Sequence, residues 1–384
     1  IKKDSIKEQD NSVDYIVPVS AKNRKSLEEY KHILLNYLTH ADTNTHALNI
    51  QNIAYTLQEK REHFNFRSAY CVTNIPELIS KLRSDTSYTE TNTEHTNKIV
   101  FMFPGQGVQY VHMAKELYAN EPFFKATIDK CIALANQHIH TDLYEVMYPG
   151  EGSSQDAIDE IQWTPISLFI LEYALAIYLE HLDIKADAYI GHSFGEYVAA
   201  TLSGVFTLED AIKVVIARGK LMQSMQAGSM LAINAKEDVV KVIVAEHDCE
   251  IAVINSPEDI VVSGNDKAIK RLQKALDEQA IPTVQINSAV AGHSKMMEQA
   301  AIEFEKVFKN IKFHKPVKKF ASNLTGEIAK EEVTTATYWC DQLRNTVQFA
   351  KGISNLSKHF NHQLSFIEVG TGKGLSYFVN KHVR

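Results

Sequence analysis

Cysteine is scarce in this sequence. The 384 residues include only Cys71, Cys131, Cys249 and Cys340, and no two of them form a C-x-x-C pair. This spacing argues against both a zinc site and a disulfide framework. We interpret the four thiols as free, small buried hydrophobic groups in a reducing cytoplasm.

The sequence also lacks a basic excess and a long apolar run. It has 40 Lys and Arg residues against 47 Asp and Glu residues, a formal net charge of −7. Nucleic acid is therefore not expected as the main partner, because neutralising phosphates needs a basic face. No run approaches the roughly 20 apolar residues of a membrane span, and no signal peptide opens the sequence. We expect a cytoplasmic protein without a membrane partner.

A serine between two glycines is the most informative feature present. Gly191-His192-Ser193-Phe194-Gly195 follows the apolar residues 188–190 and precedes a helix-like stretch at 197–202. This is the pattern of a nucleophile elbow, a strand-to-helix turn that exposes the serine hydroxyl and frees the next amide. Lipases, esterases and thioesterases carry the same pentapeptide, so a serine hydrolase is one reading.

A serine hydroxyl needs a base within reach of its oxygen before it attacks. The chain has 16 histidines, and the sequence alone does not show which one lies near Ser193. His293, in the segment 288–294, is one candidate. A second glycine-rich turn, Phe-Pro-Gly-Gln-Gly at 103–107, follows the strand-like residues 99–103.

The order of apolar patterns predicts an α/β fold. Strand-like and helical segments alternate from residue 99 to 223, which favours a parallel sheet wrapped by helices. Residues 230–286 read strand, helix, strand, strand, helix, strand, the order of a ferredoxin-like insert. Residues 15–83 read as a small structural α/β unit, and the polar run 84–97 as a seam between domains. The glycine-rich residues 368–374 lack the spacing of a phosphate loop, so no nucleotide site is expected.

Four segments in order resemble the signatures of malonyl-type acyltransferases, in particular the acyltransferase domains of modular type I polyketide synthases. They are residues 103–107, 191–196, 217–223 (Ala-Arg-Gly-Lys-Leu-Met-Gln) and the pair His293-Ser294. Residues 17–22, 54–58 and 61–64 are similar to the linker that joins ketosynthase to acyltransferase. The resemblance covers 99–384 and 15–90, and it implies a fragment of a longer chain.

The resemblance implies three parts. Residues 1–98 would form the small α/β linker domain. Residues 99–228 and 289–384 would form an α/β-hydrolase-like large subdomain with a parallel sheet. Residues 229–288 would form the inserted ferredoxin-like small subdomain.

The resemblance also assigns roles. Ser193 would be the nucleophile and His293 its base, in a Ser-His dyad whose imidazole is oriented by a backbone carbonyl. The amides of Gln106 and Phe194 would hold the oxyanion. Arg218, 25 residues after the serine, would clamp the free carboxylate of the acyl group with its planar guanidinium. A helix-surface cation is the alternative for that arginine.

Several residues depart from the usual selectivity pattern. Val290-Ala291-Gly292-His293 replaces His-Ala-Phe-His of malonyl selectors or Tyr-Ala-Ser-His of methylmalonyl selectors. Gly292 leaves room for a C2 substituent, and Thr164 places a hydroxyl where a glutamine is usual. His192 is expected as a secondary pocket residue. The hypothesis is a 2-substituted malonyl unit, with hydroxymalonyl and methoxymalonyl as polar candidates and plain malonyl as the alternative.

The expected reaction is ping-pong transfer of the acyl group through Ser193 to the phosphopantetheine thiol of an acyl carrier protein. The donor would be a phosphopantetheine thioester of coenzyme A or of a carrier protein, with no permanently bound cofactor and no metal. The carrier protein would approach the cleft between the large subdomain and the insert, and a ketosynthase domain in the same chain is the second expected partner. Two rivals stay open, a serine hydrolase or editing thioesterase and a non-catalytic docking module.

Overall fold

The structure is a computed structural model that describes residues 13–40, 48–84, 88–91, 97–150, 156–286 and 288–382. The chain divides into two compact units, residues 1–96 and 97–384. The N-terminal residues 1–12, expected to form a linker, lie outside the described residues.

The described residues of the first unit form a three-stranded antiparallel sheet, in the order β1-β2-β3, with three helices. Its elements are β1 (Tyr15–Ala21), α1 (Arg24–His40), α2 (Ile50–Glu59), β2 (Phe66–Val72), α3 (Ile75–Arg83) and β3 (Tyr88–Thr91). Asn49 and Asn74 cap α2 and α3 by accepting backbone N–H hydrogen bonds. Alternate residues of β1, Val17 and Val19, are buried in the core of this unit. Strand β3 falls within the polar run where no strand was expected.

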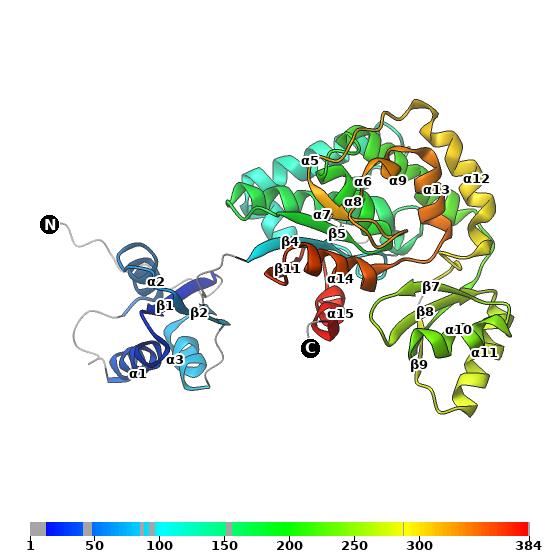
Figure 1. Cartoon of the computed structure of the whole chain (residues 1–384). Coiled ribbons are helices and arrows are strands. Elements are labelled where there is room, and N and C mark those ends of the chain that lie inside the picture. The colour runs from blue at the N-terminus through cyan, green and yellow to red at the C-terminus, as the bar shows by residue number, and fades with distance from the viewer. Residues whose placement is uncertain are drawn as a thin grey trace. The chain divides into compact units, whose positions relative to one another are not determined.

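A four-stranded parallel sheet is the centre of the second unit (Figure 1). Its order is β10 (Lys319–Ala321), β5 (Ala188–Gly191), β4 (Lys98–Phe103) and β11 (Leu364–Glu368). Successive residues of β4 enter different cores. Phe101 and Phe103 pack with residues of α5 (Pro122–Asn136), α7 (Thr164–His181) and α9 (Leu208–Gln223). Val100 and Met102 pack with residues of α14 (Phe349–His359) and α15 (Gly374–His382). Helices thus cover both faces, as the apolar strands predict.

Shorter helices complete this large subdomain. They are α4 (Lys115–Asn120), α6 (Leu143–Met147), α8 (Glu196–Leu202), α12 (Glu298–Glu305) and α13 (Ala336–Arg344). Glu368, in the glycine-rich segment that was assigned no nucleotide site, accepts hydrogen bonds from the backbone N–H groups of Leu375 and Ser376 at the start of α15. That carboxylate therefore caps a helix.

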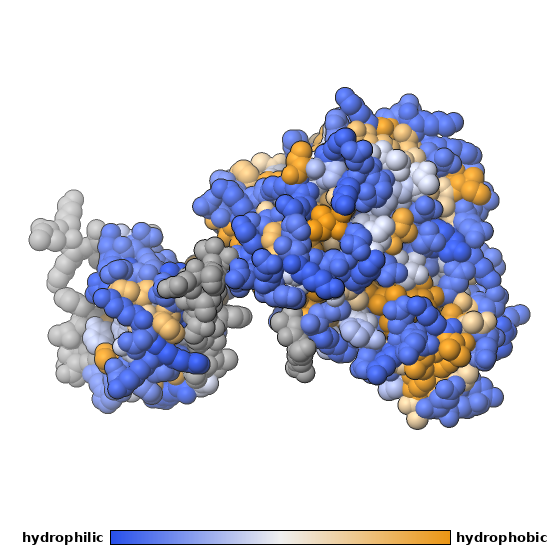
Figure 2. All heavy atoms as spheres, viewed as in Figure 1, coloured by the Kyte–Doolittle hydropathy of each residue, from blue (hydrophilic) through white to orange (hydrophobic). Residues whose placement is uncertain are grey.

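The small subdomain has the expected ferredoxin-like order. It consists of β6 (Ser229–Asn234), α10 (Glu237–Ala245), β7 (Glu250–Ile254), β8 (Asp259–Gly264), α11 (Asp266–Glu278) and β9 (Thr283–Ile286). The four strands form an antiparallel sheet in the order β7-β8-β6-β9. Figure 2 shows hydrophobic residues on the surface of this subdomain. Its exposed apolar residues include Val239, Val242 and Val284.

In the part of the chain that the structure describes, no helix combines the length and apolar character needed to cross a bilayer. The α/β fold with two subdomains is as predicted. The division of the chain at residues 98, 228 and 288 stays a prediction.

Candidate active site

The nucleophile elbow forms where β5 ends. Ser193 has a left-handed backbone with φ of 50°, as the strained turn of an elbow requires. A Cβ on Gly191 would collide with the backbone nitrogen of Glu196, and a Cβ on Gly195 would collide with the carbonyl of Phe103. Both flanking glycines are therefore required by close backbone approach.

His293 lies beside this serine although 100 residues separate them in the chain. Its Nε2 is 2.6 Å from Ser193 Oγ, and its Nδ1 is 3.1 Å from the carbonyl oxygen of Asn345. A carbonyl oxygen only accepts hydrogen bonds, so Nδ1 carries the ring hydrogen. Nε2 is then free to accept a hydrogen bond from the Ser193 hydroxyl. Burial, followed by the positive charge of Arg218, lowers the pKa of His293 to about 3. The imidazole is therefore a neutral base at physiological pH.

The turn at residues 103–107 packs against the elbow. The backbone N–H of His192 donates to the carbonyl of Phe103 over 2.8 Å. A Cβ on Gly105 would lie 3.0 Å from the carbonyl oxygen of His192 and 3.7 Å from Ser193 Cβ. Gln106, the next residue, is thus held near the nucleophile. Its amide and that of Phe194 remain the predicted oxyanion donors.

Arg218 is a buried cation on α9, with 1% of its surface exposed. Its guanidinium carbon lies 5.7 Å from the ring centre of Phe194 and 5.6 Å from that of Tyr197. Among the described residues, Nε and Nη1 of this arginine have no hydrogen-bond partner. Burial lowers its pKa, yet arginine stays charged at neutral pH. An unpaired buried charge is costly, so this arrangement suits an anionic ligand.

His192 bridges the two subdomains. Its Nε2 lies 2.7 Å from Oδ1 of Asn255, which follows β7 in the small subdomain, and its ring meets Phe349 edge-on. Burial lowers the pKa of His192. This contact identifies Asn255 as the side-chain partner of His192, the residue before Ser193.

The expected selectivity residues lie in different surroundings. Val290 and Ala291 are buried, and Ala291 packs against Gly228. A Cβ on Gly292 would meet no atom within 4 Å in the described structure, so open space adjoins this glycine. Thr164 is different, since its hydroxyl donates to the carbonyl of Ile158 over 2.7 Å and the residue is 2% exposed. That hydroxyl is engaged within the protein, and the selectivity role of Thr164 stays a prediction.

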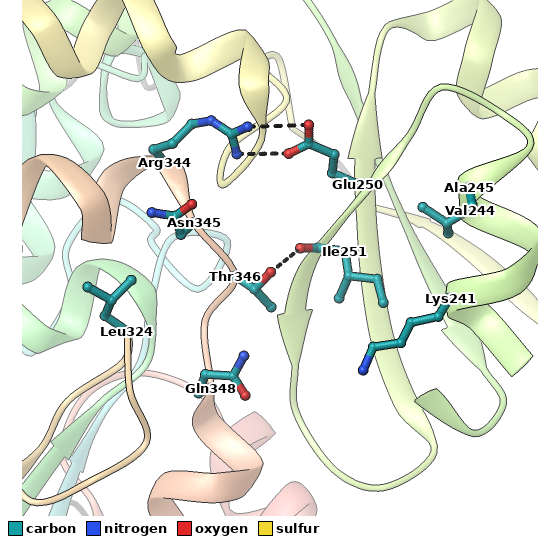
Figure 3. A pocket seen from close by; sticks show the side chains of 10 residues that line it. All are labelled: Lys241, Val244, Ala245, Glu250, Ile251, Leu324, Arg344, Asn345, Thr346 and Gln348. Atoms are coloured by element: carbon teal, nitrogen blue, oxygen red, sulfur yellow. Dashed lines mark hydrogen bonds and ion pairs between the residues drawn. The ribbon is translucent and has the colours of Figure 1, made fainter. Parts of the chain in front are cut away.

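A cavity of about 580 Å³ lies between the subdomains (Figure 3). One wall comes from α10 and β7, and the other from Leu324, the end of α13 and the residues that follow it. Arg344 makes two hydrogen bonds to Glu250 across it, of 2.8 and 3.3 Å, and the hydroxyl of Thr346 donates to the carbonyl of Ile251 over 2.6 Å. Ser193 and Arg218 do not line this cavity, whereas Asn345, whose carbonyl orients His293, does.

Four buried polar side chains lie behind the elbow: Glu196, Asn323, Tyr338 and Gln342. They contact the backbone of the elbow and one another. A signal existed for two of them, since Tyr338 and Gln342 recur at helical spacing beside the apolar residues Trp339 and Leu343.

Comparisons with known proteins agree with this geometry. Residues 100–373 match the acyl transferase domain family, and residues 15–82 match the family described as CurL-like, PKS C-terminal. The chain is 32% identical over 350 residues to one component of the phenolphthiocerol/phthiocerol polyketide synthase of Mycobacterium tuberculosis. That match covers 87% of this chain and 23% of the relative, so the chain spans about a quarter of that protein.

Two solved structures are similar over almost the whole chain. The acyl transferase domain of ZmaA is 33% identical, with a TM-score of 0.85, over 96% of this chain and 86% of that one. The acyl transferase domain of SpnD, solved in complex with 2-(pent-4-yn-1-yl)malonyl, is 28% identical, with a TM-score of 0.86, over 96% of this chain and 88% of that one. The chain is therefore an acyltransferase that belongs to the acyl transferase domain family, as found in modular type I polyketide synthases.

Proposed function

We propose that this protein loads a malonyl-type acyl group onto Ser193 and passes it to the phosphopantetheine thiol of an acyl carrier protein. Ser193 Oγ attacks the thioester carbonyl while its proton moves to Nε2 of His293. The tetrahedral intermediate then expels the donor thiol, which takes that proton, and an ester on Ser193 remains. The carrier thiol repeats these steps in reverse, with His293 again as base. This is ping-pong transfer.

The observation that carries the proposal is the unpaired guanidinium of Arg218 beside the Ser193–His293 pair. An esterase acting on neutral acyl groups has no use for a buried cation at this place. A malonyl-type carboxylate would accept hydrogen bonds from this guanidinium, whose Nε and Nη1 have no partner among the described residues. The same cation lowers the pKa of His293, so the arginine acts within electrostatic range of the base.

Open space beside Gly292 supports an acyl group that carries a substituent at C2. Gly292 directly precedes His293, and a side chain there would reduce the volume beside the reacting carbonyl. The similar SpnD domain was solved with a 2-substituted malonyl group. Hydroxymalonyl and methoxymalonyl stay among the candidates, although Thr164 offers them no free hydroxyl. Plain malonyl is the alternative.

The remaining assignments follow from this reaction. We propose the amides of Gln106 and Phe194 as the oxyanion hole, and Val290, Ala291 and His192 as walls of the acyl pocket. An acyl carrier protein and a neighbouring ketosynthase domain are the proposed partners, coenzyme A or a carrier protein brings the donor thioester, and the cytoplasm is the proposed location.

The test is intact-protein mass spectrometry of the wild type and Ser193→Ala. Each is incubated with malonyl, methylmalonyl and hydroxymalonyl thioesters of coenzyme A and of carrier protein. A stable adduct on the wild type alone supports the proposal, and its mass names the acyl group. An adduct from malonyl donors alone would refute the C2-substituent hypothesis. Free acid without a lasting adduct would favour a hydrolase, and no reaction at all would favour a docking module.

A further inference from the structure

One helix contacts both members of the catalytic pair. The side-chain Nε2 of Gln342, on α13, donates to the carbonyl oxygen of Ser193 over 2.7 Å. Just after the end of the same helix, the carbonyl of Asn345 accepts from Nδ1 of His293 over 3.1 Å. The position of α13 therefore affects both Ser193 and His293, and a shift of this helix would change how the two side chains are aligned.

The backbone at both positions is strained. Ser193 has φ of 50° and His293 has φ of 55°. These are left-handed values that residues other than glycine rarely adopt. Such conformations persist only where surrounding contacts over-determine them. Gln342 supplies one such contact on the serine side, and Asn345 supplies one on the histidine side.

Glu196 anchors α13 to the elbow. Its Oε1 accepts hydrogen bonds from the hydroxyl of Tyr338, on α13, and from the backbone N–H of Asn323 at 3.0 Å. The Asn323 side chain in turn donates to the carbonyl of Gly191 over 2.7 Å. Gln342 lies four residues after Tyr338, one helical turn away, and its amide also affects the titration of Glu196. All of these side chains are buried.

We propose that Gln342 is a positioning residue, which holds the strained Ser193 backbone so that Oγ meets Nε2 of His293, and that Glu196 positions Gln342 by anchoring α13 through Tyr338. The inference rests on the proposed chemistry of the Ser193–His293 pair. Gln342 contacts the nucleophile's carbonyl, so it acts on the alignment of the pair and not on the acyl group.

The central variant is Gln342→Met, which keeps the length of the side chain and removes the N–H donor. Its Ser193 reactivity is measured with a small fluorophosphonate. This reagent forms a bond between Ser193 Oγ and phosphorus, loses fluoride, and passes the serine proton to His293. The reaction reports the alignment of the pair without any malonyl group. Loading of the preferred malonyl-type donor is measured in parallel as kcat and KM.

We expect Gln342→Met to be labelled about ten- to a hundredfold more slowly than the wild type, from the loss of one buried hydrogen bond and the resulting misplacement. Acyl loading should fall through kcat, with KM nearly unchanged. Tyr338→Phe, a milder variant that retains the ring, should slow labelling in the same direction. The matched control is Glu172→Gln, because Glu172 is equally buried but none of its side-chain oxygens has a hydrogen-bond partner among the described residues. It should be labelled at the wild-type rate.

The melting temperature of each variant shows whether slower labelling comes from a misaligned pair in a folded protein or from unfolding. Gln342→Met labelled at the wild-type rate, or a folded wild type that is never labelled, would overturn the inference. If Gln342→Met does not fold, a normal labelling rate in Tyr338→Phe overturns it instead. A wild type that is labelled but accepts no malonyl-type donor would refute the proposed function and leave the positioning role to be judged by the labelling rates.

Discussion

The guanidinium carbon of Arg218 lies 5.7 Å from the ring centre of Phe194, the residue directly after Ser193. This places the cation against the elbow, within a cation–π distance. It also means that an acyl carboxylate bound to Arg218 would be held at a fixed distance from Ser193.

Arg218→Ala should lose on the order of a hundredfold in the transfer of a dicarboxylic acyl group, because the carboxylate would have no buried partner. Comparing malonyl with acetyl loading in this variant and the wild type checks the assignment. Unchanged malonyl loading in Arg218→Ala would refute the assignment of Arg218 as the carboxylate-binding residue.

Gly292→Phe should shift selectivity towards plain malonyl, because the ring would fill the open space beside the histidine. The ratio of 2-substituted to malonyl loading should fall by at least roughly ten- to two-hundredfold, the range that a single methylene group makes in a hydrophobic pocket. Gly292→Ala is the matched control, since its Cβ meets no described atom within 4 Å. Competition between two donors, read by intact mass, gives the ratio. An unchanged ratio in Gly292→Phe would show that the C2 group points elsewhere.

The rate of loading should not fall at pH 6.5, where a free histidine would lose half of its basic form. Burial and Arg218 lower the pKa of His293 to about 3, so the neutral base persists as the pH drops from 8 to 5. The relevant measurement is kcat/KM for loading, which reports the free enzyme. The same pH profile is measured in Glu196→Gln, because this variant lacks the Glu196 carboxyl, which also titrates between pH 5 and 8. A drop centred near pH 6.5 in both proteins would contradict the buried, neutral histidine.

The free energy of unfolding should contain a contribution from Glu196 that declines as pH rises. Burial raises the pKa of this carboxyl from 4.5 to about 7. The folded protein therefore holds a proton that the unfolded chain has lost between these values, so this contribution is full below pH 4.5 and is gone above pH 7. Its size is on the order of 3 kcal/mol.

Urea denaturation at pH 5 and pH 7.5 measures this effect in the wild type and Glu196→Gln. The lowered pKa of His293 works in the opposite direction, since its stability contribution is lost as pH falls below 6.5. His293 is present in both proteins, so the difference between their pH-dependent free energies of unfolding gives the contribution of the Glu196 carboxyl. Parallel pH dependences in the two would contradict a raised pKa at Glu196.

Local patterns in the sequence predicted most of what the fold shows. The glycines around Ser193 indicated an elbow because their constraint is local, and the alternation of apolar segments indicated both sheets. His293 could be named only through the order of motifs, since nothing near it in the chain shows that it meets a serine 100 residues away.

The supporting residues were missed for a physical reason. Asn345 acts through a backbone carbonyl, which any residue possesses, and Gln342 acts through an amide 149 residues from its partner. Neither contact can be read from a single sequence, although the helical spacing of Tyr338 and Gln342 marks the helix that carries the glutamine. The hydrogen bond of Thr164 was out of reach of the sequence for a related reason, since the first turn of α7 brings its hydroxyl to the carbonyl of Ile158.

The contacts that Gln342 of α13 and the following Asn345 make with Ser193 and His293 bear on the construction of hybrid synthases. A crossover placed between His293 and Tyr338 would pair the elbow and base of one parent with the helix of another, so the contacts of α13 and Asn345 with both would span the junction. Grafts that take residues 97–384 as one piece keep these contacts within a single parent. Changes confined to residues 290–292 would leave them untouched. The architecture thus favours reprogramming the acyl group by point substitution or by whole-unit exchange over recombination inside the unit.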